Sequence, residues 1–284
     1  MDHTPHSHTP HSSPAGLFAS AVDVTYVGHA TVLVEMNGVR ILTDPVLRHR
    51  VGWLRNRHRT PQPEWVRDVD AVLISHLHLD HMDPPSLKLL GPATRLIVPA
   101  GAGRVFRGLG FDRVEELRPE GFTSVGGVTI SGTPALHTGQ RFPGGPDADC
   151  LGFLLRGDYH VYFAGDTALF PGMEDLGGPA ADPLDLALLP VWGWGPRLGE
   201  NHLTPESAAE SLSLLRPRRV VPIHWGTLHP LGMGWLKPGF LTRPPRDFAQ
   251  HAALVAPGVC VHVVRPGQSL SLRDKGDNVA DEAA

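Results

Sequence analysis

The chain has 284 residues, of which 41% are hydrophobic and 19% charged, and its formal net charge at pH 7 is −4. This composition indicates a globular protein of one large or two small domains and excludes global disorder. The slightly acidic balance gives no basic field, so we expect no nucleic-acid partner. Two cysteines and the lack of any long apolar run predict a cytoplasmic protein without disulfides, transmembrane segment or secretory signal.

The two ends of the chain differ in composition from its middle. Residues 1–16 are rich in His, Pro, Ser and Thr and contain four of the 17 histidines. Residues 273–284 are also polar. Because neither end has apolar residues to bury, we predict a disordered His-rich tail at 1–16, a single folded domain over 17–272 and a flexible tail at 273–284.

Between the tails, β-branched and apolar runs alternate with Gly and Pro, which is typical of strands. The expected strands cover residues 22–27, 31–35, 39–43, 71–75, 95–99, 128–131, 151–155, 160–164, 184–190 and 220–223. The Asn37-Gly38 pair joins the second and third strands and predicts a tight hairpin.

Three helices are expected among these strands, at residues 84–90, 101–109 and 205–215. The last is the clearest, because Thr204 can cap its N-terminus and Pro205 occupies its first position. Strands interleaved with helices over this length predict an α/β protein in which stacked sheets are flanked by helices.

Side chains of the metal-binding type directly follow the fourth expected strand. The sequence there is HLHLDH, so four such residues fall within six positions. His76 and His78 would project to one side and share a metal, while Asp80 and His81 follow in the next turn and can face a second ion. Imidazoles together with a carboxylate suit zinc, iron or manganese. This motif therefore predicts a metal site.

Three further candidate ligands come just after β-rich runs: His137, Asp166 and His224. Loops at such positions gather functional groups at one rim of a sheet. Gly165 would let the backbone turn so that the carboxylate of Asp166 points into a cavity. A lone histidine after a strand is more often structural, but here three residues recur together with the HLHLDH motif, so we expect them to complete the site.

The motif and these three residues arrive in the order used by the metallo-β-lactamase-fold hydrolases, which the chain resembles over residues 22–265. Within that fold it most resembles the N-acyl-phosphatidylethanolamine phospholipase D group, with ascorbate-phosphate lactonases as neighbours. The segments that carry the narrower resemblance are LTDP (42–45), VLISH (72–76), FAGDT (163–167) and IHWGT (223–227). The resemblance implies a four-layered αβ/βα sandwich and a metal-dependent hydrolase.

The resemblance also implies a ligand set for two divalent ions, with zinc expected and manganese or iron as alternatives. The first ion would be held by His76, His78 and His137, the second by Asp80, His81 and His224, and Asp166 would bridge the two. Two ions about 3.5–4 Å apart would generate a bridging hydroxide that attacks phosphorus or a carbonyl carbon.

Further roles follow from the same resemblance. Asp80, Asp166 and His202 are the expected catalytic residues. His202 would stabilise the oxyanion or protonate the leaving group. Asp44 would orient a ligand histidine through its other ring nitrogen.

The expected substrate is a small-molecule or lipid-like ester. Trp192 and Trp194 match the substrate-facing loop of the family, although simple core packing would explain them too. Arg48 and Arg50 begin an arginine-rich stretch without acids that follows the LTDP segment, which favours an anionic substrate.

We therefore expect a dinuclear hydrolase, with a phosphodiesterase as the first choice and a lactonase or other carboxylic-ester hydrolase as the alternative. A non-catalytic metal-binding member of the fold is the alternative from another class. Such a protein would be expected to have lost ligands, whereas all seven positions are filled here. The sequence leaves the oligomeric state open.

Overall fold

Two seven-stranded sheets form the centre of the protein in the computed structural model, which describes residues 21–58, 62–179 and 182–273. Apart from Arg273, the expected tails lie outside the described residues. Cys150 and Cys260 are both free thiols and both half-buried. Among the described residues, no helix is long and apolar enough to cross a membrane.

The first sheet combines an antiparallel and a parallel half. Its strands, in spatial order, are β17 (Gln268–Leu272), β1 (Val22–Gly28), β2 (Thr31–Met36), β3 (Val39–Thr43), β6 (Ala71–Leu73), β7 (Leu96–Pro99) and β8 (Val114–Leu117). The strands from β17 to β3 pair antiparallel, and those from β3 to β8 pair parallel. The expected hairpin joins β2 to β3, where Met36 pairs with Val39 across Asn37 and Gly38.

The second sheet repeats this plan. Its strands, in spatial order, are β16 (Cys260–Val261), β14 (Arg219–Ile223), β13 (Leu186–Pro190), β12 (His160–Phe163), β11 (Leu151–Arg156), β10 (Val128–Pro134) and β9 (Phe122–Val125). Pairing is antiparallel from β9 to β12 and parallel from β12 to β16. The parallel strands of both sheets therefore send their carboxyl ends, and the loops that follow, to the rims that carry the functional groups.

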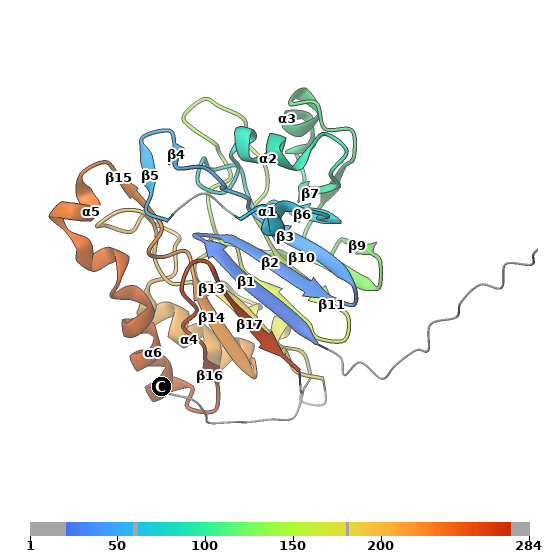
Figure 1. Cartoon of the computed structure of the whole chain (residues 1–284). Coiled ribbons are helices and arrows are strands. Elements are labelled where there is room, and N and C mark those ends of the chain that lie inside the picture. Colours follow the sequence, from blue (N-terminus) through green and yellow to red (C-terminus); the bar gives the residue numbers. More distant parts are fainter. Residues whose placement is uncertain (1–20, 59–61, 180–181, 274–284) are drawn as a thin grey trace, which may run out of the picture.

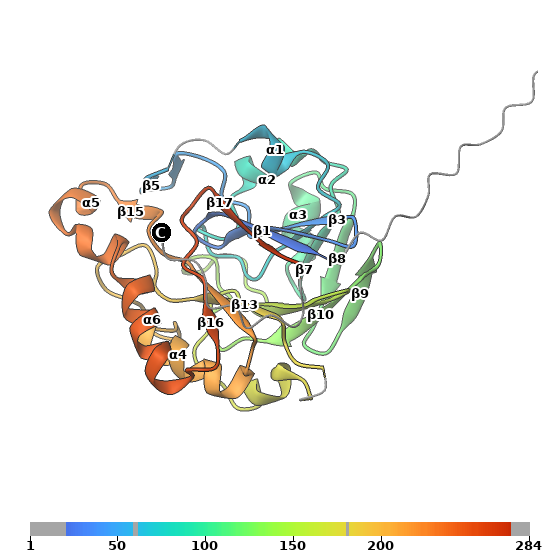
Figure 2. The same ribbon diagram turned by 60° about the horizontal axis from the view of Figure 1, so that its bottom comes forward.

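Helices cover the outer faces of both sheets, which produces the expected four layers (Figures 1 and 2). The helices beside the first sheet are α1 (Pro63–Val66), α2 (Pro84–Leu90) and α3 (Gly103–Gly108), and those beside the second are α4 (Pro205–Leu215) and α6 (Pro244–Val255). Figure 2 shows the sheets nearly edge-on between these two sets of helices. The four-layered αβ/βα sandwich is thus confirmed.

Apolar side chains fill the space between the layers. One cluster lies between the facing sides of the two sheets. It contains Val24 and Ile41 of the first sheet and Phe153 of the second. It continues through the second sheet to Leu212 of α4 and Phe248 of α6. A separate cluster packs the first sheet against α2 and α3. Burial on both faces explains why the central strands read as continuous apolar runs.

Capping residues set where two of the expected helices begin. Asp83 accepts a hydrogen bond from the backbone N–H of Ser86 at the start of α2. Thr204 and Ser207 form a reciprocal capping box at the start of α4. Both helices have the expected residue ranges, 84–90 and 205–215.

Some elements were not expected from the sequence. The helix α6 is one, and a small third sheet is another, made of β15 (Leu228–Pro230), β5 (Leu54–Asn56) and β4 (Arg50–Val51). Short segments α5 (Met233–Leu236), η1 (Met173–Gly177) and η2 (Pro238–Leu241) complete the structure. The small sheet lies at one end of the sandwich (Figure 1). Its apolar side chains Val51, Leu54 and Leu228 form a small hydrophobic cluster, against which Trp194 packs.

Candidate functional site

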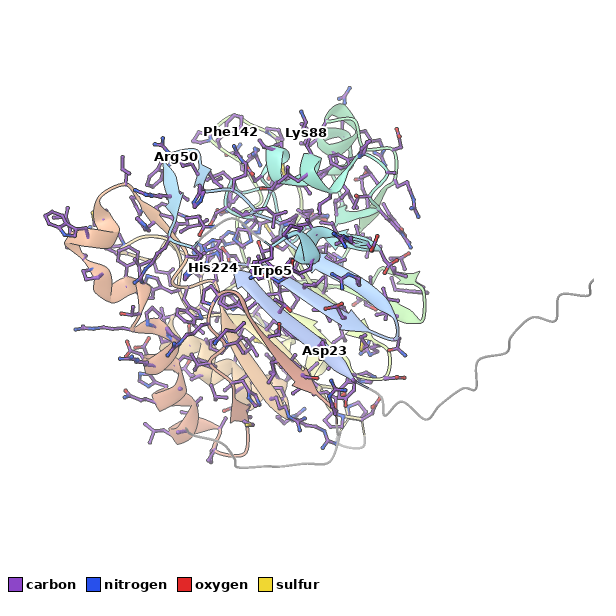
Figure 3. All side chains as sticks on the ribbon, viewed as in Figure 1. Asp23, Arg50, Trp65, Lys88, Phe142 and His224 are labelled. Carbon is purple, nitrogen blue, oxygen red and sulfur yellow. The ribbon has the colours of Figure 1, made fainter. Side chains whose placement is uncertain are left out.

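Polar side chains gather where strands of both sheets end. Asp44 directly follows β3, and His224 directly follows β14. His76 and Asp166 each come three residues after the end of a strand, β6 and β12 respectively. All four side chains are buried, with exposed fractions of 0–3%. Figure 3 shows His224 near one end of the central strands.

Three of the expected ligands converge as a first histidine cluster. Nε2 of His76 lies 3.0 Å from Nδ1 of His78, and Nε2 of His137 lies 3.0 Å from the same atom. One nitrogen from each ring falls within 4.8 Å of the others. The structure thus brings together the set expected for the first ion.

The set expected for the second ion converges beside it. Nε2 of His81 lies 2.9 Å from Nε2 of His224, and Oδ2 of Asp80 lies 3.7 Å from each of these nitrogens. His29 belongs to the same group of atoms within 4.8 Å. The HLHLDH motif therefore contributes side chains to both clusters.

Asp166 lies between the two clusters. Its Oδ2 is 3.1 Å from Nε2 of His81, and its Oδ1 is 3.3 Å from Nε2 of His224. It also shares a group of potential ligand atoms with His137 of the first cluster. Gly165 permits this placement: its φ is +61°, and a Cβ there would approach Cβ of Ser75 to 2.6 Å.

Hydrogen bonds from Nδ1 fix the orientation of two of the histidine rings. Nδ1 of His224 donates to the backbone oxygen of Trp192 at 2.6 Å, and Nδ1 of His137 donates to that of Asn201 at 3.1 Å. Because a carbonyl oxygen can only accept, the proton of each neutral ring must sit on Nδ1. The Nε2 lone pairs of both rings consequently point inward.

Asp44 orients two further rings in the same way. It accepts a hydrogen bond from Nδ1 of His81 at 2.7 Å and one from the hydroxyl of Ser75 at 2.5 Å. Since the Ser75 hydroxyl donates to Asp44, its oxygen accepts from Nδ1 of His76 at 2.9 Å. One buried carboxylate therefore presents Nε2 of both histidines to the centre, a device that outer partners of metal ligands commonly provide.

The donor set fits divalent metal ions. Nε2 of His81 and Nε2 of His224 face each other across 2.9 Å, so their lone pairs repel unless a cation, either a proton on His81 or a metal ion, lies close to both. Oδ1 of Asp166 is a buried oxygen that makes no hydrogen bond. Imidazole nitrogens with carboxylate oxygens are ligands that zinc, iron and manganese accept.

Electrostatics set the charge of each of these groups in the metal-free protein. Burial lowers the pKa of His76 well below its usual range and that of His137 to about 4, so both rings are neutral. Burial opposes ionisation of Asp166 too, but His224 and His81 outweigh it and hold its pKa well below the usual range. The pKa of His81 is raised well above its usual value, because Asp166 and Asp80 outweigh the effect of burial. In the metal-free protein His81 therefore carries a second proton, which a bound metal ion would displace.

His202 lies beside the clusters on a different loop. Its Nδ1 donates to the backbone oxygen of Glu200 at 2.9 Å, and its Nε2 lies 3.4 Å from Oδ2 of Asp166. Burial lowers its pKa, but the hydrogen bond and charge of Asp166 outweigh this and raise the pKa above the ordinary value. A proton on Nε2 is therefore favoured at a position facing the clusters.

A cavity of about 460 Å³ opens over this arrangement. Its wall includes Asp80, Asp166, His202 and His224 together with Trp194. Its other lining residues are His78, Leu79, Arg141, Gly193, Gly195, Arg197, Leu198 and Gly199. Chemistry-bearing groups, apolar side chains and two arginines thus share one concave site.

The family profile described as the Beta-lactamase superfamily domain matches residues 39–225, which includes both clusters except His29. The chain belongs to the metallo-β-lactamase superfamily. It is 31% identical over 261 residues to a UPF0173 metal-dependent hydrolase of Rubrobacter xylanophilus, an alignment covering 87% of this chain and 95% of that protein. It is a metal-dependent hydrolase of this fold.

Two further relatives of this superfamily member extend the comparison. The N-acyl-phosphatidylethanolamine-hydrolyzing phospholipase D 1 of Caenorhabditis elegans is 35% identical over 244 residues, which cover 78% of this chain and 66% of that protein. The structure of Igni18, a metallo hydrolase from Ignicoccus hospitalis, superimposes with a TM-score of 0.69 at 26% identity, covering 89% and 99% of the two chains.

The two tryptophans of the expected substrate loop differ in this metallo-β-lactamase-fold protein. Trp194 lines the cavity, and its ring meets that of Trp53 edge-on at a centroid distance of 4.7 Å. Trp192 is not among the lining residues. It packs against the main core, and its indole N–H donates to Gly195 while its carbonyl receives the bond from His224.

The two arginines expected to bind substrate also lie outside the cavity lining. Arg48 makes two hydrogen bonds to the carboxylate of Asp83, at 2.7 and 2.6 Å. Arg50 is exposed on β4 and lines a different hollow beside Leu231. Figure 3 shows Arg50 out on the small sheet, apart from His224. The cations that do line the cavity are Arg141 and Arg197.

Sequence reasoning assigned no role to two residues that the structure brings to the site. His29 lies in the second cluster, and Arg141 lies in the cavity wall. The signal for His29 was its place two residues after the end of an expected strand, in Gly28-His29-Ala30. The signal for Arg141 was its position four residues after the candidate ligand His137.

Proposed function

We propose that this protein is a dinuclear hydrolase of phosphodiesters, with a small-molecule or lipid-like substrate. The observation that carries the proposal is the inward orientation of four histidine Nε2 atoms around Asp166, each fixed by a hydrogen bond on Nδ1. Because the Nδ1 proton of each ring is bound on its outer side, Nε2 is the atom that each ring presents to the centre.

The residues that would hold the ions follow from the two clusters. The first ion would be bound by His76, His78 and His137, the second by Asp80, His81 and His224, with Asp166 between them. We favour zinc, because histidine nitrogens predominate in both sets. When bound, the ions would supply activated water and stabilise negative charge on the reacting oxygens.

The chain's own groups would assist in two ways. His202 would hold a proton on Nε2, as its pKa is raised beside Asp166, and would deliver it to the leaving oxygen. Asp166, whose Oδ2 lies 3.4 Å from Nε2 of His202, would in turn help to aim that ring. Apolar cavity residues such as Leu79 and Trp194 would cover the organic part of the substrate and exclude water from it.

Two observations favour a phosphodiester over a neutral ester. Arg141 and Arg197 give the cavity wall positive charge that an anionic substrate can use. In addition, the C. elegans relative carries the name of a phospholipase D. A lactonase is the second candidate, because Leu79, Trp194 and Leu198 would also cover a neutral ring.

A paired assay tests the proposal. Zinc-loaded protein is given bis(p-nitrophenyl) phosphate and, separately, γ-butyrolactone, with a chelator-treated sample as the control. We expect hydrolysis of the phosphodiester with the higher kcat/KM, lost on chelation and restored by added metal. Faster lactone hydrolysis would select the second candidate, and no metal-dependent turnover of either substrate would contradict the proposal.

A further inference from the structure

Arg141 occupies a special place in the cavity wall. It lies in the loop after β10, four residues beyond His137, and is half-buried. Its Nη1 donates hydrogen bonds to the backbone oxygens of Leu77 at 2.6 Å and Met82 at 3.0 Å. A cationic side chain is thus held against the loop that carries the HLHLDH motif.

These two bonds fix the guanidinium rigidly. Leu77 separates His76 from His78, and Met82 directly follows His81, so one nitrogen spans the whole motif. The side chains of Leu77 and Met82 are 0% and 1% exposed, which anchors the carbonyls that Arg141 binds. A donor held in advance loses less conformational entropy when a ligand arrives.

The other nitrogens of Arg141 are available to a ligand. Nε and Nη2 form no hydrogen bond with any residue that the structure describes, and neither is among the buried polar atoms that lack a partner. Each of them therefore keeps some exposed surface. Two parallel N–H groups of this kind match the geometry of two oxygens on one phosphate or carboxylate.

The charge of Arg141 is also uncompensated at close range. Asp83 is the acid that acts on it electrostatically, but Asp83 already accepts both guanidinium bonds of Arg48. Arg197, the other cation of the wall, is exposed, and its side chain makes no hydrogen bond to a described residue. Arg141 is therefore the better-ordered cation facing the cavity.

We propose that Arg141 is the anion-binding residue of the cavity, which selects substrates bearing a negatively charged oxygen over neutral esters. The expected effect of Arg141 on catalysis rests on the proposed function. The binding of an anion by Arg141 does not. The guanidinium would bind the non-reacting oxygens through Nε and Nη2, while Nη1 stays on the motif loop. Such an interaction acts on the bound substrate as well as on the transition state, so its loss raises KM more than it lowers kcat.

Binding of phenylphosphonate, an inert anion, tests the proposal without catalysis. Calorimetry on the zinc-loaded full chain should give a Kd that is about 10- to 100-fold higher for Arg141→Met than for the unaltered protein, as expected for lost charge-assisted hydrogen bonds. Arg113→Met makes the same change at an exposed position outside the cavity and should leave the Kd unaltered. An unchanged Kd in Arg141→Met would overturn the proposal.

A second variant separates anion binding from support of the motif loop. Arg141→Lys keeps the charge but not the fork, and should weaken phenylphosphonate binding by a smaller factor while retaining the metal content. If either variant holds less metal, the comparison is made between metal-free proteins, where the same ranking is expected. Equal affinities of all three metal-free proteins would again overturn the proposal.

Kinetics link the binding step to the proposed function. In Arg141→Met, KM for bis(p-nitrophenyl) phosphate should rise at least tenfold, while kcat/KM for neutral p-nitrophenyl acetate should change by less than threefold. Equal losses on both substrates would contradict selection for anions. If the unaltered protein hydrolyses neither substrate, the proposed function fails, and the calorimetric result still decides the role of Arg141.

Discussion

Nε2 of His29 lies 2.9 Å from Oδ2 of Asp80, so a residue of the first hairpin bonds a carboxylate of the HLHLDH motif. His29 is 1% exposed, and burial lowers its pKa to about 3. Its Nδ1 has no hydrogen-bond partner, which leaves the single proton of the neutral ring on Nε2, where it is donated to Asp80. The ring also packs against His224 at a centroid distance of 3.8 Å. His29 thereby aims one expected ligand and supports another.

Replacing His29 should weaken the second metal site selectively. Asn suits the left-handed backbone at this position (φ +57°) but would not reach Asp80 in the same way. We expect His29→Asn to bind one of two ions about 10- to 100-fold more weakly, the usual effect of losing an outer partner. Titration against a chelating dye measures this. His58→Asn, which removes a half-buried histidine outside the clusters, is the control. Unaltered affinity for both ions in His29→Asn would contradict the assigned role.

Asp166→Ala should remove the group shared by the two clusters. We expect loss of at least one ion and nearly complete loss of turnover, measured by elemental analysis and by the paired assay. The fold should persist, because Asp166 follows the end of β12, and circular dichroism checks this. Asp158→Ala, at an exposed turn, should retain full metal and activity. Two bound ions with near-normal activity in Asp166→Ala would rule out a bridging carboxylate.

His202→Ala should separate catalysis from metal binding. Metal content should be retained, whereas the rate should fall by roughly 10²–10⁴-fold if the ring protonates the leaving group. The loss should be smaller for a nitrophenolate leaving group, which needs no proton, than for an alkoxide. Equal losses would instead favour stabilisation of the oxyanion. Lost metal would make His202 a ligand or a support, and unaltered kinetics would remove it from the mechanism.

The metal-free protein should lose stability as the pH falls from about 6.5 to about 4. In the folded state, burial lowers the pKa of His29 to about 3 and that of His137 to about 4. In the unfolded chain both take up a proton near pH 6.5, so the unfolded state binds more protons in this interval. The raised pKa of His81 stabilises the folded state as well, but this contribution is lost only at higher pH, as the pH rises through the pKa that His81 has in the folded state. Thermal melts of chelator-treated protein at pH 6.5, 5.5 and 4.5 should show a falling Tm, and a rising Tm would contradict this reading.

Local patterns in the sequence predicted much of the fold and which side chains gather at the candidate site. Apolar runs bounded by Gly and Pro predicted the central strands, and Thr204 and Pro205 predicted the start of α4. By contrast, α6 presents only Phe248 and Ala252 to the core beyond its opening prolines, which is too narrow a stripe to show as helical periodicity. The strands of the small sheet are only two or three residues long.

The remaining features of the site depend on contacts between segments that are distant in the sequence, which local patterns do not predict. His29 meets a partner 51 residues away, and nothing near either residue indicates the pairing. The arginine-rich stretch indicated an anionic substrate, but Arg48 is occupied by Asp83, 35 residues further along. Trp192 and Trp194 look alike in sequence, yet one joins the core and the other lines the cavity. Charge and aromatic content favoured a site for an anionic substrate with an apolar part. Which arginines and tryptophans line the cavity depends on the tertiary fold.

The metal content of the protein tests the central claim most directly. The four histidines of residues 1–16 could bind extra metal, so the measurement uses the full-length chain with His3, His6, His8 and His11 replaced by alanine. After zinc loading and removal of free metal, elemental analysis should give two ions per chain, because the seven expected ligands form two adjoining sets. A saturated value of one ion or fewer would contradict the dinuclear site.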